Sequence, residues 1–257
     1  MGTLYVVGTP IGNLEDVTLR AIRILREADV IAAEDTRVTR TVLAAHDIRT
    51  PLVSFHEFSG PEQVRRLVER LQVEDVALVC DAGMPGLSDP GFPLIRAALD
   101  AGIPVVPIPG PSAILAALVA SGQPMHAFSF YGFLPRKSGE RRRFLERLRE
   151  VDHTVVVFES PHRVAAALRD VAEVLGTTRP IAACRELTKK FEEVVRGPAG
   201  DVAERLGRGT PRGEFTLVIG PSGKAPGRGA RTTDWSGIGE PTAGRDAGAG
   251  DAESADQ

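Results

Sequence analysis

The chain has 257 residues, with Lys or Arg at 31 positions and Asp or Glu at 34, which gives a formal net charge of −3. A chain of this length can bury a core without disulfides or metals, and its near-balanced charge argues against a protein that coats nucleic acid with its whole surface. The two cysteines, Cys80 and Cys184, lie in apolar runs without metal-ligand spacing, so we expect core residues in a reducing compartment. The longest apolar run, residues 113–120, is too short to cross a bilayer and the first residues lack a leader pattern, so the sequence predicts a cytoplasmic protein without membrane contact.

The first half of the chain alternates short β-branched runs with amphipathic stretches. This rhythm of strand, crossover helix and strand is typical of a parallel α/β sheet. The predicted strands are residues 4–8, 30–35, 76–80 and 105–110, and the predicted helices are residues 18–28, 61–72, 91–101 and 111–122. We expect these elements to form an N-terminal α/β domain over residues 1–120.

A second α/β pattern follows, with looser spacing that leaves antiparallel pairs open. Its predicted strands are residues 128–133, 153–160, 180–187 and 213–220, and its predicted helices are residues 138–150 and 163–176. We expect a second domain over residues 121–222, with a cleft between the two domains. Residues 223–257 are rich in Gly, Ala, Asp and Thr and lack apolar periodicity, so they are predicted to be a disordered tail.

Two glycine-containing loops follow predicted strands. The first, GTPIGN at residues 8–13, has its glycines at 8 and 12 and no lysine after them, so it matches neither the dinucleotide fingerprint nor the phosphate-binding loop. A tight turn explains this loop as well as a ligand contact does. A classical nucleotide-binding fold is therefore not favoured.

The second loop, DAGMPGLSDPG at residues 81–91, also lacks a cation. Its glycines permit close backbone approach, its prolines rigidify the loop, and Asp81 lies at the carboxyl end of a strand, where open α/β sheets bind ligands. A stiff turn is the alternative, but a turn needs far fewer such residues. The loop favours a ligand with hydrogen-bonding edges and positive charge rather than bare phosphates.

Charged side chains gather at several other strand ends. AEDTR places Glu34, Asp35 and Arg37 together, as a solvated turn or as a polar-substrate site. The histidines of SFHEF and FESPHR, His56 and His162, have no third partner that the spacing reveals, so no catalytic triad is inferred.

A basic segment, PRKSGERRRFLERLRE at residues 135–150, carries seven Lys or Arg against three Glu. It is the best candidate for contacts with a phosphate backbone, although a solvated helix face explains much of the same pattern. RELTKK adds Arg185, Lys189 and Lys190 at the end of a predicted strand. A lysine there either anchors RNA, helps to deprotonate a hydroxyl, or belongs to an ordinary charged surface.

Eight ordered blocks within residues 1–221 together resemble the ribosomal RNA small subunit methyltransferase I family of the tetrapyrrole methylase superfamily. These blocks are VGTPIGNLEDVTLRA, AEDTR, DAGMPGLSDPG, PGPSA, GFLPRK, FESPHR, RELTKKFEE and RGEFTLVI. The resemblance implies two α/β domains, distinct from the classical Rossmann methyltransferase fold, and a homodimer. It also implies S-adenosylmethionine in the interdomain cleft and methylation of a cytidine ribose 2′-hydroxyl of 16S rRNA, in the decoding region of the 30S subunit.

The resemblance also implies roles for individual residues. The second loop would hold the methionine part of the cofactor through Asp81, Gly83, Met84 and Leu87, while Pro10 of the first loop would lie on the acceptor side. The other implied cofactor contacts are Ser112 and Ala113 of PGPSA, and Phe158, Leu187, Glu214 and Phe215 around the adenine.

A sulfonium is already a strong methyl donor, so the protein must mainly align the reacting atoms and assist the departing proton. Lys189, Glu34 and Asp35 are the expected catalytic groups, without a metal. The expected RNA contacts are Arg37, Arg136, Lys137, Arg141, Arg142, Arg143 and Lys190.

The chain departs from the family pattern in two places. It has no recognisable C-terminal helical module after the GEFTLVI block, and the stretch after SFH reads EFSG in place of a histidine-rich block, which weakens any role for His56. Two other functions remain open on the sequence: a methylase of a tetrapyrrole or another small molecule, and a non-catalytic RNA-binding assembly factor.

Overall fold

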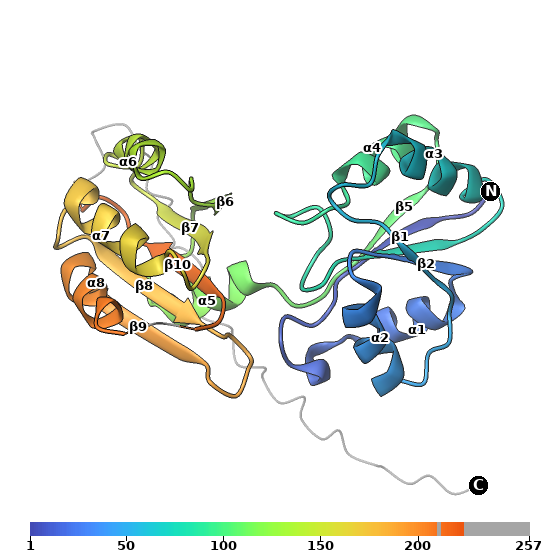
Figure 1. The fold of residues 1–257 in the computed structure, drawn as a ribbon, viewed down its shortest axis with the longest axis horizontal. Coiled ribbons are helices and arrows are strands. Elements are labelled where there is room, and N and C mark those ends of the chain that lie inside the picture. The colour runs from blue at the N-terminus through green and yellow to red at the C-terminus, as the bar shows by residue number, and fades with distance from the viewer. Residues whose placement is uncertain (210–211, 224–257) are drawn as a thin grey trace, which may run out of the picture. The chain divides into compact units, whose positions relative to one another are not determined.

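The computed structural model describes residues 1–209 and 212–223. These residues contain two five-stranded sheets, which are shown with their helices in Figure 1. The predicted disordered tail lies outside the described residues from position 224 onward. Within the described part of the chain, no helix is long and apolar enough to cross a membrane.

The first sheet is entirely parallel and has the strand order β3-β2-β4-β1-β5. Its strands are β1 (Leu4–Val7), β2 (Val30–Ala33), β3 (Leu52–Ser54), β4 (Val76–Val79) and β5 (Val105–Ile108). All residues of β2 and β4 are buried, because helices cover both faces of the sheet.

The helices of this sheet divide between its two faces. On one face pack α1 (Leu19–Glu27) and α2 (Thr36–Ala45), and on the other α3 (Pro61–Arg70) and α4 (Phe92–Asp100). A short 3-10 turn, η1 (Leu14–Asp16), precedes α1. The neighbouring strands β1 and β4 therefore lead to helices on opposite faces, so the loops that follow them diverge. Such a switch point is where open α/β sheets bind ligands.

The second sheet is mixed and has the order β6-β7-β10-β8-β9. Its strands are β6 (Phe128–Phe133), β7 (Thr154–Glu159), β8 (Pro180–Arg185), β9 (Glu193–Pro198) and β10 (Phe215–Ile219). Only β6 and β7 pair in parallel; the other pairs are antiparallel. The register of β6 shifts between Phe130 and Phe133, beside Gly132 with its φ of 65°.

Helices α6 (Ser138–Glu146), α7 (Val164–Leu175) and α8 (Ala199–Gly207) cover one face of the second sheet. The other face packs against α5 (Ala113–Ser121) through Ala117 and Leu118 of the helix and Val156 and Val218 of the sheet. By its packing α5 thus belongs with the second sheet, although it falls in residues 1–120. The division at residue 120 stays a prediction.

The α/β alternation and most elements agree with the sequence, but four elements were not predicted. They are the α-helices α2 and α8 and the strands β3 and β9; the short 3-10 turn η1 was not predicted either, and α6 ends at Glu146 rather than at residue 150. In α2, threonines and arginines separate the buried Val42 and Leu43 from the rest of the helix, so its apolar pattern is weak. Its start is marked by Asp35, whose Oδ1 accepts from the Arg37 backbone NH at 2.8 Å.

Candidate functional site

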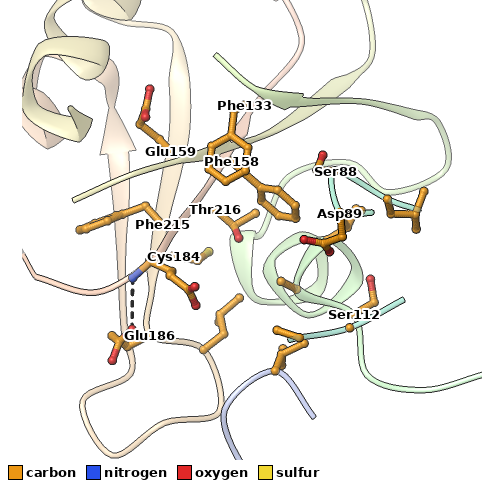
Figure 2. Close-up of a pocket in the computed structure, with 18 of the residues that line it drawn as sticks. Ser88, Asp89, Ser112, Phe133, Phe158, Glu159, Cys184, Glu186, Phe215 and Thr216 are labelled. Carbon is orange, nitrogen blue, oxygen red and sulfur yellow. Dashed lines mark hydrogen bonds between the residues drawn. The ribbon is translucent and has the colours of Figure 1, made fainter. Parts of the chain in front are cut away.

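A cavity of about 320 Å³ lies beside the loop that follows β4 and reaches the second sheet (Figure 2). Its lining comes from three sources: the two glycine loops, the start of α5, and strands β6, β7, β8 and β10 with the loops at their ends. The lining residues are Ile11, Ala82, Gly83, Met84, Leu87, Ser88, Asp89, Ser112, Ala113, Ile114, Phe133, Phe158, Glu159, Ser160, Pro161, Cys184, Glu186, Leu187, Lys189, Glu214, Phe215 and Thr216.

The two loops after β1 and β4 are joined by a short antiparallel bridge. Thr9 and Gly83 exchange backbone hydrogen bonds of 2.9 and 3.1 Å, and the Thr9 hydroxyl donates to the Cys80 carbonyl at 3.1 Å. Gly8 lies against Gly110, so closely that a Cβ on Gly8 would stand 2.7 Å from the Gly110 Cα. These contacts hold the two loops together next to the cavity and leave no room for a side chain between Gly8 and Gly110.

The second loop bends through several left-handed residues. Gly83 and Gly86 have φ of 79° and 87°, and Ser88, which has a Cβ, has φ of 68°. A non-glycine residue in this region is strained, and such strain is concentrated at functional sites. The loop presents backbone groups and Asp89 to the cavity and no cation, as its sequence indicated.

Part of the opposite wall is apolar. The rings of Phe133 and Phe158 lie 5.6 Å apart, and Phe158 also meets Phe130 edge-on at 4.9 Å. Leu187 and Ile114 extend this apolar surface. Ser112 begins α5 as its N-cap, with its hydroxyl accepting from the Leu115 NH at 3.4 Å. The wall can therefore cover a flat apolar or aromatic group.

Lys189 is tied to two carboxylates. Its Nζ donates to Glu186 Oε1 and to Glu214 Oε2, each at 3.0 Å. Partial burial by itself lowers the pKa of Lys189, but these two hydrogen bonds outweigh it, so the pKa is raised above its usual value. The same pairing holds the pKa of Glu186 below its usual value in spite of burial. Lys189 is thus a fixed cation near neutral pH and not a proton acceptor.

Asp89 has the opposite environment. The pKa of Asp89 is raised to about 6, mainly by burial and next by repulsion from the carboxylate of Glu34. Asp81 and Glu214 add smaller repulsions, and a hydrogen bond with the Cys80 thiol partly offsets the rise. Cys80 is itself buried, and burial raises the pKa of its thiol far above the usual range. Both cysteines are free and buried, as predicted from their apolar runs.

Most of the predicted cofactor residues lie at this cavity. Gly83, Met84, Leu87, Ser112, Ala113, Phe158, Leu187, Glu214 and Phe215 line it, and so does Lys189. Asp81 does not. Its Oδ1 accepts from the Asp35 NH at 3.0 Å, its own NH donates to Glu34 Oε2 at 3.3 Å, and Asp35 pairs with Arg37 at 2.6 Å. The predicted Glu34–Asp35 pair therefore belongs to a separate acidic cluster beside the cavity.

Sequence reasoning missed part of the lining. Ser88 and Asp89 belong to the second loop, and Glu159 and Ser160 belong to the FESPHR block. The spacing of these residues does not distinguish those that face a cavity from their neighbours. Figure 2 shows Glu159 turned away from Phe158, as strand alternation requires. Its Oε1 accepts from Arg163 at 2.8 Å, and its Oε2 has no partner in the described structure.

The predicted RNA contacts separate into different environments. Arg141 is buried at 4% exposure, and its Nε donates to the buried Asp170 at 2.7 Å, so the structure corrects its assignment: it serves the fold and does not face RNA. Arg142 also donates to Asp170, at 2.8 Å. Arg136 and Arg143 are exposed and form no ion pair with any described residue. The remaining three are also at the surface: Arg37 pairs with Asp35, Lys137 with Glu140, and Lys190 lies over the Phe191 ring.

A shallower groove adjoins the cavity and shares Ile11 and Ser112 with it. Two of its lining residues, Asp16 and Thr188, each have a buried side-chain oxygen without a hydrogen-bond partner in the described structure. Thr188 has φ of 66°, which strains a β-branched residue. Among the residues described, no group of three His, Cys, Asp or Glu side chains is placed to hold a metal ion.

Comparison with known proteins places this site in a family. The family model of tetrapyrrole (corrin/porphyrin) methylases matches residues 3–203. Ribosomal RNA small subunit methyltransferase I of Halalkalibacterium halodurans is 49% identical over 224 residues, covering 87% of this chain and 77% of that protein. The Bacillus subtilis protein of the same name is 47% identical over 220 residues, covering 85% and 75%.

The fold also has relatives among solved structures. Uroporphyrin-III C-methyltransferase of Thermus thermophilus, solved in complex with S-adenosylhomocysteine, superposes with a TM-score of 0.60 at 24% identity, over 86% of this chain and 98% of that one. This likeness confirms the predicted fold class, two α/β units of the tetrapyrrole methylase type. The chain belongs to the tetrapyrrole methylase family and, within it, to the ribosomal RNA small subunit methyltransferase I family.

Proposed function

We propose that this protein transfers a methyl group from S-adenosylmethionine to the RNA of the small ribosomal subunit, and specifically to the 2′-hydroxyl of a cytidine in the decoding region of 16S rRNA. The observation that carries the proposal is the cavity beside the switch point, where a cation-free glycine loop faces an apolar wall. Relatives of 47–49% identity that carry the name of rRNA methyltransferase support the choice of acceptor.

The cavity suits each part of this cofactor. Backbone groups of Gly83 and Met84 suit the amino and carboxylate ends of the methionine part, and Phe158 and Leu187 offer an apolar cover for adenine. The sulfonium brings its own positive charge, which fits a pocket whose second loop supplies no cation. Asp81 lies outside the lining, so we retain it as a support of the loop rather than a cofactor contact.

The acceptor is proposed to enter from the side of the groove that contains Asp16 and Thr188. The groove meets the cavity at Ile11 and Ser112, so an acceptor bound in the groove would lie beside the proposed cofactor. Binding there would bring a ribose oxygen to the methyl carbon in line with sulfur, which is the main contribution that the protein must make.

The test is incubation of the protein with 30S subunits and methyl-labelled S-adenosylmethionine, followed by digestion of the rRNA to nucleosides. We expect label in 2′-O-methylcytidine from the decoding region, with activity that persists in EDTA. Label in a tetrapyrrole but not in rRNA would favour the small-molecule alternative. RNA binding without cofactor affinity in calorimetry would favour the non-catalytic assembly factor.

The exposed arginines give a prediction for RNA affinity. The double variant Arg136→Ala, Arg143→Ala is expected to weaken 30S binding severalfold. The slope of log affinity against log salt concentration should also become less steep by about 1–2, because each phosphate contact contributes about 0.7–0.9 to it. The matched control is Arg65→Ala, an exposed arginine of α3. Filter binding from low to high salt measures both effects, and equal slopes in all three proteins would contradict the assignment.

We also propose a homodimer, as the family resemblance implies. Leu115 and Val119 of the apolar helix α5 are 55% and 72% exposed. These exposed apolar side chains offer a surface on which a second copy of the chain could pack. Light scattering at micromolar concentration is expected to give twice the mass of the chain.

A further inference from the structure

The cavity contains six ionisable side chains, and the structure separates them by their partners: Asp89, Glu159, Cys184, Glu186, Lys189 and Glu214. Glu186 and Glu214 are paired with Lys189. Glu159 pairs with Arg163. The Cys184 thiol points to the Ala117 carbonyl, and burial raises its pKa to about 11. Asp89 is the remaining acid, and no described cation pairs with it.

Asp89 is also directed at the reaction space. Figure 2 shows its carboxylate pointing from the second loop toward the side of the cavity that holds Thr216 and Phe158. It lies in the same loop as Gly83 and Met84, which are proposed to hold the donor end of the cofactor. The carboxylate therefore faces the space that a bound acceptor would share with the donor end of the cofactor.

We propose that Asp89 is the catalytic residue that accepts the proton of the acceptor hydroxyl. The inference rests on the proposed function and names the group that the methyl transfer requires. As the hydroxyl oxygen forms its bond to the methyl carbon, the carbon–sulfur bond breaks and its electron pair stays on sulfur, which leaves a neutral thioether. The hydroxyl proton passes to a carboxylate oxygen of Asp89 and is released to water after the product departs.

The surroundings of Asp89 explain why it suits this task better than the other candidates. The negative charges of Glu34, Asp81 and Glu214 act on Asp89, while Lys189 is held by Glu186 and Glu214. With a pKa of about 6, Asp89 is mainly ionised at pH 7, yet it binds a proton more strongly than an ordinary aspartate. The two carboxylates thus have pKa values shifted in opposite directions: that of Asp89 is raised and that of Glu186 is lowered. Such a separation of pKa values is typical of acid–base sites.

The test compares the wild type, Asp89→Asn and Asp89→Glu in single-turnover methylation of 30S subunits at saturating S-adenosylmethionine. We expect Asp89→Asn to lower the rate constant by 10²–10⁴-fold, the usual range for a general base, while calorimetry finds cofactor affinity changed by less than about threefold. Asp89→Glu should recover part of the loss. The matched control is Asp100→Asn, an exposed aspartate of α4 that pairs with Arg96.

The pH profile provides a second readout. In the wild type the rate constant is expected to rise with pH through about 6, because the ionised carboxylate is the active form, and this limb should be absent in Asp89→Asn. Glu34→Gln should move the limb to lower pH, since it removes a repelling charge.

The outcomes separate the two proposals. A wild type that binds cofactor but never methylates 30S subunits overturns the proposed function, and the role of Asp89 with it. An active wild type whose Asp89→Asn variant stays within threefold overturns the role of Asp89 alone. Loss of cofactor affinity in parallel with rate would make Asp89 a binding contact instead. If Asp89→Asn does not fold, a wild-type profile without the limb near pH 6 also overturns the proposal.

Discussion

Replacing Asp170 by asparagine is expected to lower the free energy of unfolding by about 3–5 kcal/mol, the usual cost of removing one partner of a buried ion pair. Asp170 is 4% exposed and accepts from Arg141 at 2.7 Å, from Arg142 at 2.8 Å and from the Ser138 hydroxyl at 3.1 Å. Without the carboxylate charge, the buried Arg141 guanidinium keeps its own charge, while the asparagine amide and the carbonyls of Pro135 and Arg136 offer it only neutral acceptors. Urea unfolding of both proteins measures the difference.

The effect should depend on pH with a defined sign. Burial alone would raise the pKa of Asp170, but the hydrogen bonds from Arg141 and Arg142 outweigh it, and the pKa is lowered. Because the pKa of Asp170 is lower in the folded state, its ionised carboxylate stabilises the fold at any pH above its pKa in the unfolded chain, which is about 3.9. This contribution is lost as the pH falls through the pKa of Asp170 in the folded protein. The difference in free energy of unfolding between the wild type and Asp170→Asn should therefore become smaller at acid pH.

Glu173 provides the matched control, because it also pairs with Arg142 but its side chain is 56% exposed. Glu173→Gln should change the stability by less than about 1 kcal/mol, as is usual for surface ion pairs. Equal losses in the two variants would contradict the view that burial of Arg141 makes Asp170 important. That result would also reopen Arg141 as an RNA contact.

Replacing Gly8 by alanine is expected to weaken cofactor binding by at least tenfold and to lower the free energy of unfolding by about 1–3 kcal/mol, the usual cost of overpacking. A Cβ there would stand 2.7 Å from the Gly110 Cα and 2.8 Å from the Met84 sulfur. Because the obstacle includes backbone, the loops after β1 and β5 must separate, and Met84, which lines the cavity, must shift as well. Calorimetry with S-adenosylmethionine and thermal unfolding measure the two effects.

Gly207→Ala is the matched control. Gly207 ends α8, and a Cβ on it would meet no atom within 4 Å. We expect unchanged cofactor affinity and unchanged or slightly higher stability, since alanine favours helix over glycine. A Gly8→Ala variant with the affinity of the wild type would show that the close contact with Gly110 does not shape the cavity.

Local sequence patterns are enough to predict the class of fold and the loop that lines the cavity. Alternating strands and amphipathic helices indicated the α/β pattern, because side-chain periodicity depends only on local geometry. The glycines and prolines of the loop at residues 81–91, together with its lack of a cation, indicate a binding site. Gly83, Met84 and Leu87 of this loop line the cavity. The eight motif blocks are enough on their own to indicate the family, because they do not depend on packing.

Which side chains are available to a ligand depends on contacts that form only in the folded chain. Arg141 and Arg143 stand two positions apart in one basic run, yet the first is buried against Asp170 and the second is exposed, because the orientation of α6 depends on its packing against α7. Asp81 and Asp89 stand in one loop, yet only Asp89 lines the cavity, because left-handed turns at Gly83, Gly86 and Ser88 redirect the chain between them. Burial and partners arise from contacts between residues far apart in sequence, and local patterns do not encode them.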